Sequence, residues 1–211
     1  MTEKFHNIYR VLSVRLQNWD YGSNGAYFIT ICTQNREQLF GEIENGKMIL
    51  NEIGKQAETC FHEIPVHFPF VELGNFVVMP NHVHAIIILN KPAITVGNTG
   101  DDTVETRLIA SLSLPEQSTT PSPESFFVET YESPKSGGFA GCKNPMIHDN
   151  LSRIIRWYKG RTTFESRKIH TDFAWQPRYH DHIIRNATSF EKIQNYIAKN
   201  PLNWNEDKFN E

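Results

Sequence analysis

The chain has 211 residues, of which 39% are hydrophobic and 21% charged, a composition typical of a soluble globular protein of one domain with insertions. Disorder over the whole chain is therefore excluded. With 21 Lys and Arg against 24 Asp and Glu, the net charge of −3 argues against a uniformly basic coat for nucleic acid.

Membrane, secretion and thiolate signals are missing from the sequence. No stretch approaches the ~18 apolar residues of a membrane helix, and residues 1–6 lack the basic start and apolar run of a secretion signal. We therefore expect a cytoplasmic protein with no membrane partner. The three cysteines, Cys32, Cys60 and Cys142, form no CxxC pair, so any metal must be held by nitrogen or oxygen atoms.

The first 90 residues contain the patterns of strands and of one helix. The Asn45-Gly46 and Pro80-Asn81 pairs mark turns between apolar runs. The predicted elements are a buried strand over 26–33, an amphipathic helix over 50–62 closed by Pro65, and strands over 70–73 with 76–79 and over 83–89.

Composition changes between residues 91 and 148, which carry six of the eleven prolines and five of the twelve glycines. This stretch is predicted to be a flexible insertion or linker, apart from an apolar island at 107–112. The domain is therefore expected to have a first part over 1–90 and a second part over 149–211.

Regular structure is predicted to resume at Asp149-Asn150, a helix N-cap. A fourth strand is predicted over 175–185, and a last helix over 190–200, capped by Thr188 or Ser189 and ended by Pro201. The order strand, helix, strand, strand, helix, strand predicts an α+β fold. We expect a ferredoxin-like (split βαβ) antiparallel sheet with helices on one face, an additional C-terminal helix and the long irregular insertion.

Two His-x-His motifs could hold a metal. In a strand, His82 and His84 project to one side while Val83 points into the core, which makes a two-point site for a divalent cation. The same pattern also fits two histidines on the wetter face of a half-buried strand. The second motif, at 180–182, ranks lower because its middle residue, Asp181, would have to face the core.

Residues 77–87, Val-Val-Met-Pro-Asn-His-Val-His-Ala-Ile-Ile, resemble the signature of the single-tyrosine HUH transposases. Residues 175–185 and 196–201 look like the REP-associated tyrosine transposases, a branch of the insertion-sequence-200-like family. The resemblance spans residues 19–90 and 149–204. It implies that the two histidines hold Mg²⁺ or Mn²⁺ and that Tyr196 attacks a DNA phosphate, forming a 5′-phosphotyrosine and freeing a 3′-hydroxyl. By position, Asn200 matches the family's third metal ligand.

Helical spacing agrees with that implication, because Tyr196 and Asn200 are four residues apart and share one face of the last predicted helix. Without the resemblance, its spacing beside Ile193 and Ile197 would favour a core aromatic for Tyr196. A tyrosine has an ordinary pKa near 10, so its attack on a phosphate needs a metal to polarise the phosphate. Of the other tyrosines in the basic C-terminal part, we expect Tyr158 to be buried and Tyr179 to stack on a base.

The DNA partner is expected on the basic segment 149–185, where eight Lys and Arg stand against four Asp and Glu. Trp157 and Trp175 are alternative stacking platforms, although core positions suit both better. The resemblance implies single-stranded or hairpin (REP-like) DNA and a monomer or homodimer. The expected DNA-binding residues are Arg153, Arg156, Lys159, Arg161, Arg178, Tyr179, His182 and Arg185.

Two other functions remain open at the level of sequence. The first is a catalytically silent nucleic-acid-binding module on the same sheet. The second is a zinc hydrolase using the same histidines, which lacks a general-base glutamate in an HExxH-like setting.

Overall fold

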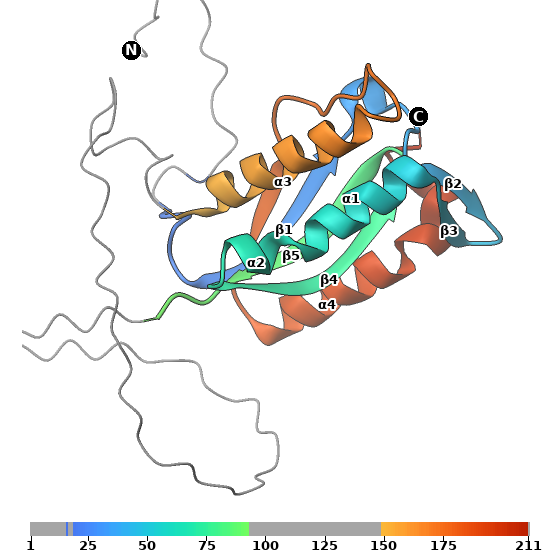
Figure 1. Ribbon diagram of the computed structural model, residues 1–211. Helices are drawn as coiled ribbons and strands as arrows, with labels where there is room; N and C mark the ends of the chain where they lie inside the picture. Colours follow the sequence, from blue (N-terminus) through green and yellow to red (C-terminus); the bar gives the residue numbers. More distant parts are fainter. Residues whose placement is uncertain (1–15, 17–18, 93–148, 211) are drawn as a thin grey trace, which may run out of the picture.

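The computed structural model describes residue 16 and residues 19–92 and 149–210. The predicted insertion lies outside the described residues from residue 93 onward, and so does its apolar island. Figure 1 shows a main sheet with helices on both of its faces and a separate two-stranded hairpin over residues 41–50.

The main sheet has four antiparallel strands in the order β4-β5-β1-β6. This order, with the two central strands first and third in the chain, is the predicted ferredoxin-like arrangement. Its strands are β1 (Gly25–Cys32), β4 (Val71–Met79), β5 (His82–Leu89) and β6 (His180–Ile184).

Helices cover the two faces of this sheet unequally (Figure 1). The helices α1 (Glu52–His62), α2 (Ile64–His67) and α3 (Leu151–Ser166) share one large apolar core with the sheet. The helix α4 (Ala187–Lys199) packs on the opposite face, where it forms a smaller apolar cluster around Ile86, Ile184 and Ile197. The predicted additional C-terminal helix therefore covers the second face and is followed by the 3-10 segment η4 (Asn200–Glu206).

Strand alternation decides which side chains meet each helix layer. In β5, Val83, Ala85 and Ile87 belong to the large core with α1 and α3. The alternate residues His82, His84 and Ile86 therefore point to the side of α4. The predicted core position of Val83 is confirmed, as its side chain is fully buried.

Asparagine side chains begin three helices, because their oxygens accept the backbone N–H groups that the first helical turn leaves unpaired. Asn51 caps α1, and Asn150 caps α3 as predicted. The predicted caps of the last helix are wrong: Asn186 caps α4 by accepting from the Ser189 backbone N–H at 2.8 Å. The last helix consequently begins at Ala187.

Two predicted strands need correction, and one hairpin was not predicted. This hairpin consists of β2 (Gly41–Glu44) and β3 (Lys47–Leu50), which the turn at Asn45-Gly46 connects; both turn residues have positive φ. The two predicted pieces over 70–79 form one strand, β4, with an irregularity between Leu73 and Phe76. The predicted strand over 175–185 shrinks to β6, because Pro177 has no N–H for a ladder and Trp175 makes only an isolated bridge.

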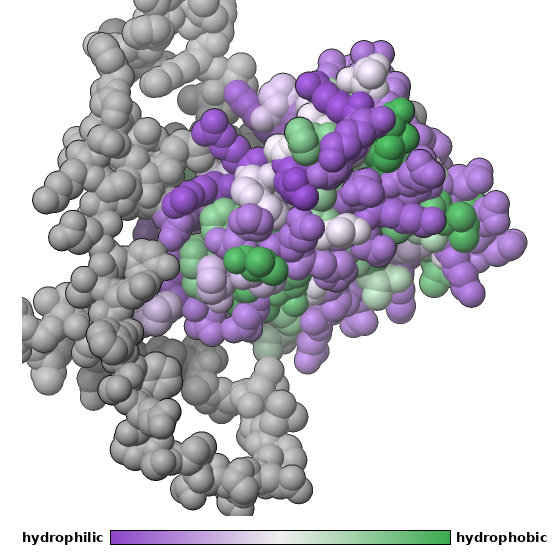
Figure 2. Space-filling view, in the orientation of Figure 1, coloured by the Kyte–Doolittle hydropathy of each residue, from purple (hydrophilic) through white to green (hydrophobic). Residues whose placement is uncertain are grey.

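The surface of the face that carries α1 and α3 is mostly hydrophilic, with scattered apolar side chains (Figure 2). Among the described residues, no helix combines the length and the apolar character needed to cross a bilayer.

Candidate metal and tyrosine site

The two histidines of β5 lie side by side in a buried position. His82 is 0% exposed and His84 is 1% exposed, and their ring centroids are 4.4 Å apart. Burial follows from the topology, since β5 is flanked by β1 and β4 and covered by α4 on this side. The predicted two-point arrangement is therefore formed.

Each histidine uses one ring nitrogen for a neighbouring side chain. His82 Nδ1 is 2.9 Å from Asn81 Oδ1, and His84 Nδ1 is 2.9 Å from Thr30 Oγ1. These contacts leave both Nε2 atoms for other partners. His84 Nε2 is 3.2 Å from the Tyr196 hydroxyl, whereas His82 Nε2 is buried with no hydrogen-bond partner of acceptable geometry in the described part of the chain.

Tyr196 and Asn200 lie one turn apart at the end of α4, on the same side as the histidines. The Tyr196 side chain packs edge-on against Phe28 and is 43% exposed, so solvent can reach it. Asn200 is buried, and its Oδ1, like His82 Nε2, is without a hydrogen bond to any described residue. Its Nδ2 donates to Asp207 Oδ2 at 3.2 Å.

Asp207 is a residue that sequence reasoning missed. The 3-10 segment η4 turns the chain back after α4, with Trp204 buried near the His82 ring, and delivers Asp207 to the site. Nitrogen and oxygen atoms of His82, His84 and Asp207 all lie within 4.8 Å of one another. Because α4 ends at Lys199 and η4 is a kinked 3-10 segment, helical periodicity does not extend to Asp207, and no local pattern could have identified it.

These residues fit a divalent cation. Two imidazole nitrogens, a carboxylate and an amide oxygen form a mixed nitrogen and oxygen donor set. His82 Nε2 and Asn200 Oδ1 lack hydrogen bonds within the described residues, and buried polar atoms ordinarily have a partner.

The protonation states in the folded protein suit metal binding. Burial, with a smaller contribution from the Arg36 guanidinium, lowers the pKa of His82 to about 3. Burial and the neighbouring His82 ring lower the pKa of His84 well below its ordinary value. Both rings are therefore neutral at pH 7. Burial and the Asp207 carboxylate raise the pKa of Tyr196, so this phenol remains protonated without a cation nearby.

A cavity of about 620 Å³ opens beside these residues. Tyr196 and His84 form part of its wall. Cationic side chains at this cavity would attract a phosphate chain. They are Arg36, Arg178 and Lys208.

The predicted DNA-binding residues are divided between different surfaces. Arg178 and Tyr179 line the cavity at the histidines. Arg153, Arg156 and Arg161 are exposed on α3 and line a separate cavity of about 600 Å³ with His67 and Trp157. Two remaining residues, His182 and Arg185, are exposed on or just after the edge strand β6.

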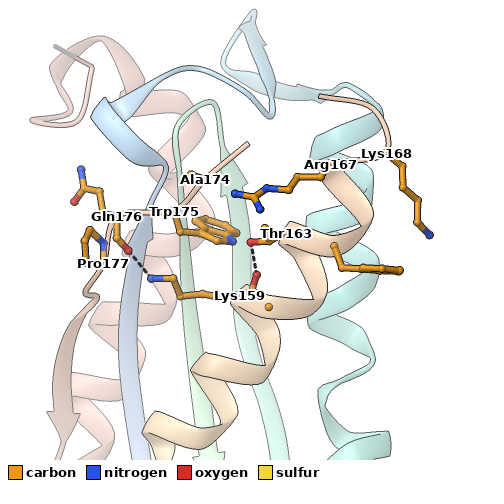
Figure 3. A pocket seen from close by; sticks show the side chains of 10 residues that line it. Lys159, Thr163, Arg167, Lys168, Ala174, Trp175, Gln176 and Pro177 are labelled. Carbon is orange, nitrogen blue, oxygen red and sulfur yellow. Dashed lines mark hydrogen bonds between the residues drawn. The ribbon is translucent and has the colours of Figure 1, made fainter. Parts of the chain in front are cut away.

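Lys159 lies in a third cavity, of about 720 Å³, between α3 and residues 174–177 (Figure 3). Its Nζ donates to the Gln176 carbonyl at 2.5 Å and to the Arg178 carbonyl at 3.4 Å. Burial lowers the pKa of Lys159 to about 8. Gln176 lines both this cavity and the cavity at the histidines. Lys159 therefore holds in place a segment, residues 176–178, that lies between the two cavities.

The two tryptophans and Tyr158 of the basic segment are more buried than a stacking role requires. Trp175 is 8% exposed and packs against Phe40 and Phe173, and Tyr158 is fully buried as predicted. Trp157 is partly buried against the large core and lies 4.2 Å from the His67 ring.

The second His-x-His motif lies on the same side of the sheet as the first. His180 is paired in register with Thr30 and His182 with Phe28, and both are exposed. Asp181 points to the other face at this edge strand, where it is half-buried. The metal-ligand group formed by described residues does not include this motif.

The fold is similar to that of a solved transposase. The structure of the REP-associated tyrosine transposase bound to a REP hairpin superposes with a TM-score of 0.51 and 19% identity, covering 93% of this chain and 77% of that chain. This likeness shows the fold.

A relative at the level of sequence defines the family. An uncharacterized protein of Haemophilus influenzae (strain ATCC 51907 / DSM 11121 / KW20 / Rd) is 33% identical over 210 residues, which covers 99% of this chain and 98% of the relative. The chain belongs to the same family as this Haemophilus protein. No family model matches the chain.

Proposed function

We propose that the protein is a REP-associated tyrosine transposase of the insertion-sequence-200-like family, an endonuclease and strand transferase for single-stranded, hairpin-containing DNA. One observation carries the proposal: the Tyr196 hydroxyl lies 3.2 Å from His84 Nε2, beside the buried acceptor atoms of His82 and Asn200. The solved relative of this fold was bound to a REP hairpin, which supports the class of substrate.

His82, His84 and one or both of Asn200 and Asp207 would hold Mg²⁺ or Mn²⁺ in this proposal. When bound, the cation would polarise the scissile phosphate and offset the charge that develops during attack. Because both imidazoles are neutral at pH 7, binding would displace no proton from them. The Tyr196 hydroxyl now uses His84 Nε2, so a cation on that nitrogen and this hydrogen bond exclude each other.

The covalent step in the proposal is a transesterification. The Tyr196 hydroxyl gives its proton to solvent and its oxygen forms a bond to phosphorus, while the bond from phosphorus to the 3′-oxygen breaks. The departing 3′-oxygen takes a proton from solvent, and the 5′-phosphate remains on Tyr196. The energy of the broken phosphodiester is kept in the new ester, so rejoining the strand needs no nucleoside triphosphate.

DNA would enter through the cavity at the histidines, where Arg36, Arg178 and Lys208 attract its phosphates. Tyr179 at the same cavity would stack on an unpaired base. The arginines of α3, together with Lys159, His182 and Arg185, would contact other parts of a structured DNA.

The test is formation of a covalent adduct. The purified protein is incubated with labelled hairpin oligonucleotides carrying random single-stranded flanks, with Mn²⁺ or with EDTA. A labelled band that resists SDS and appears only with Mn²⁺ supports the proposal. DNA binding without an adduct, for every flank in the library, would instead identify a catalytically silent DNA-binding module.

A further inference from the structure

Asn81, the residue immediately before the two histidines, has a buried side chain whose amide is held from three directions. It is 1% exposed. Its Nδ2 donates to the Arg36 carbonyl at 3.1 Å and to the Phe209 carbonyl at 2.6 Å, and its Oδ1 lies 2.9 Å from His82 Nδ1.

This network determines which way the amide points. A carbonyl oxygen can only accept a hydrogen bond, so the NH₂ group of Asn81 must face the Arg36 and Phe209 carbonyls. The amide oxygen is then left to face His82. The reversed amide would put two pairs of acceptors against each other and is excluded by the same chemistry.

The amide in turn determines the tautomer of His82. Because an amide oxygen cannot donate, the 2.9 Å contact with Asn81 Oδ1 is a hydrogen bond only when the proton of the neutral ring lies on Nδ1. The lone pair then lies on Nε2, where the neighbouring Asn200 side chain offers a second acceptor, Oδ1. Neither atom has a hydrogen bond in the described ranges, and a cation can bind both. A ring in this state is ready to bind a cation without rearrangement.

The backbone of Asn81 is fixed as well, so the amide has little freedom to turn away. Its carbonyl accepts from the Thr33 backbone N–H at 2.9 Å. This bond ties the turn between β4 and β5 to the end of β1. The position of the His82 ring is thus set by the fold.

His84 offers an internal comparison. Its Nδ1 faces the Thr30 hydroxyl, which can donate or accept, and its Nε2 faces the Tyr196 hydroxyl, which also can do either. The chain therefore fixes one tautomer for His82 and leaves two open for His84.

We propose that Asn81 is the positioning residue of the metal site: its amide holds His82 as the tautomer protonated on Nδ1, with the Nε2 lone pair directed at the cation. The inference rests on the proposed metal site. It assigns a role to the asparagine of the Pro-Asn-His-Val-His sequence beyond ending the turn.

The first measurement is made on the unaltered protein without metal. Two-dimensional ¹H–¹⁵N correlation spectra of the histidine rings report which nitrogen carries the proton. His82 is expected to be protonated on Nδ1 alone. A His82 ring protonated on Nε2 would overturn the proposal whatever the variants do.

The second measurement is the affinity for Mn²⁺, by calorimetric titration, of the variants Asn81→Ala and Asn81→Asp. Loss of a partner in the second shell of a metal ligand typically weakens metal binding about 10- to 100-fold, and Asn81→Ala should show this loss together with a mixture of His82 tautomers. Asn81→Asp retains an acceptor toward His82 and should keep the Nδ1 proton and bind Mn²⁺ more tightly than Asn81→Ala. Its second carboxylate oxygen opposes the Arg36 and Phe209 carbonyls, so its melting temperature should fall.

Asn150→Ala serves as the matched control, because Asn150 is another buried asparagine that caps a helix away from the site. It should lower the melting temperature and leave the Mn²⁺ affinity unchanged. A folded Asn81→Ala protein that binds Mn²⁺ as the parent does would contradict the proposal. If Asn81→Ala does not fold, the tautomer in the unaltered protein still decides the question.

Failure of the proposed function gives a different result. A protein that never forms a DNA adduct but shows the expected tautomer and Mn²⁺ affinities would retain the role of Asn81 and lose the transposase proposal. If the parent protein forms a Mn²⁺-dependent adduct but Asn81→Ala binds Mn²⁺ as tightly as the parent, the transposase proposal is retained and the role of Asn81 is lost.

Discussion

The two His-x-His motifs occupy the same side of one sheet and have opposite surroundings. His82 and His84 lie on the central strand β5 and are buried under α4 and the segment that follows it. His180 and His182 lie on the edge strand β6 and are exposed. The spacing alone brings two imidazoles to one face in both cases.

What separates the two motifs is the set of groups around each ring. At β5, Asn81 and Thr30 hold the Nδ1 atoms, and Asn200, Asp207 and Tyr196 surround the Nε2 atoms. Ligation depends on such partners, because they set tautomer, orientation and charge. The comparison indicates that the strand position, central or edge, decides which motif is surrounded by further donor atoms.

The largest expected effect is the loss of metal binding on removal of the first motif. His82→Ala with His84→Ala should weaken Mn²⁺ binding by more than ~100-fold. Losing a group that only hydrogen-bonds a ligand already weakens binding by up to about 100-fold, and this double variant removes two ligands. His180→Ala with His182→Ala is the matched control and should leave the Mn²⁺ affinity unchanged in the same titration. An equal loss in both pairs would break the comparison.

The second effect concerns stability against pH. The pKa values of His82 and His84 are lowered in the folded protein, while unfolded histidines titrate near 6.5. As pH falls below 6.5, the unfolded chain binds protons that the folded chain does not, so the free energy of unfolding should fall by about 2–3 kcal/mol for the pair between pH 7 and 5.5.

Urea unfolding at the two pH values measures this difference in metal-free protein. His82→Gln with His84→Gln should lose most of the pH dependence, whereas His62→Gln, at an exposed histidine of α1, should retain it. A double variant with the parent's pH dependence would show that the two rings are not neutral in the folded state.

The third effect shows whether Asn200, the ligand implied by the family resemblance, or Asp207 is the third metal ligand. Asn200→Ala should weaken Mn²⁺ binding about tenfold, because its Oδ1 is a buried acceptor beside His82. Asn203→Ala, an exposed asparagine of the same η4 segment, is the control. If Asn200→Ala matches the control and Asp207→Asn instead shows the tenfold loss, Asp207 is the third ligand.

The sequence predicted the parts of this site that depend on local periodicity. Alternation in a strand placed His82 and His84 together, and the helical repeat placed Tyr196 with Asn200. The order of strands followed from the pattern of elements. Asp207 depends on the path of η4 after the last helix, and no repeat in the sequence encodes that path.

For a similar reason, the sequence did not predict which surfaces the expected DNA-binding residues occupy. Charge counting identified the basic segment but could not show that Lys159 faces the chain segment at 176–178 while Arg153 and Arg156 face α2. Helical residues three apart can point to different neighbours once the helix is packed.

The smallest expected effect concerns the arginines of α3. Arg153→Ala with Arg156→Ala should reduce the slope of log affinity against log salt for hairpin DNA by up to about 2, because each phosphate contact releases condensed counterions. Lys47→Ala with Lys55→Ala removes the same charge from other exposed positions and should leave the slope unchanged. Equal slopes in all three proteins would remove this surface from the DNA interface.

The most direct measurement is identification of the tyrosine that becomes linked to DNA. The adduct formed in Mn²⁺ is digested with trypsin and nuclease, and the nucleotide-bearing peptide is sequenced by mass spectrometry. The proposed mechanism predicts that the label lies on Tyr196, in the peptide spanning Ile193 to Lys199, and that Tyr196→Phe eliminates the adduct in a folded protein. Recovery of the label on Tyr179 would contradict the assignment of the nucleophile.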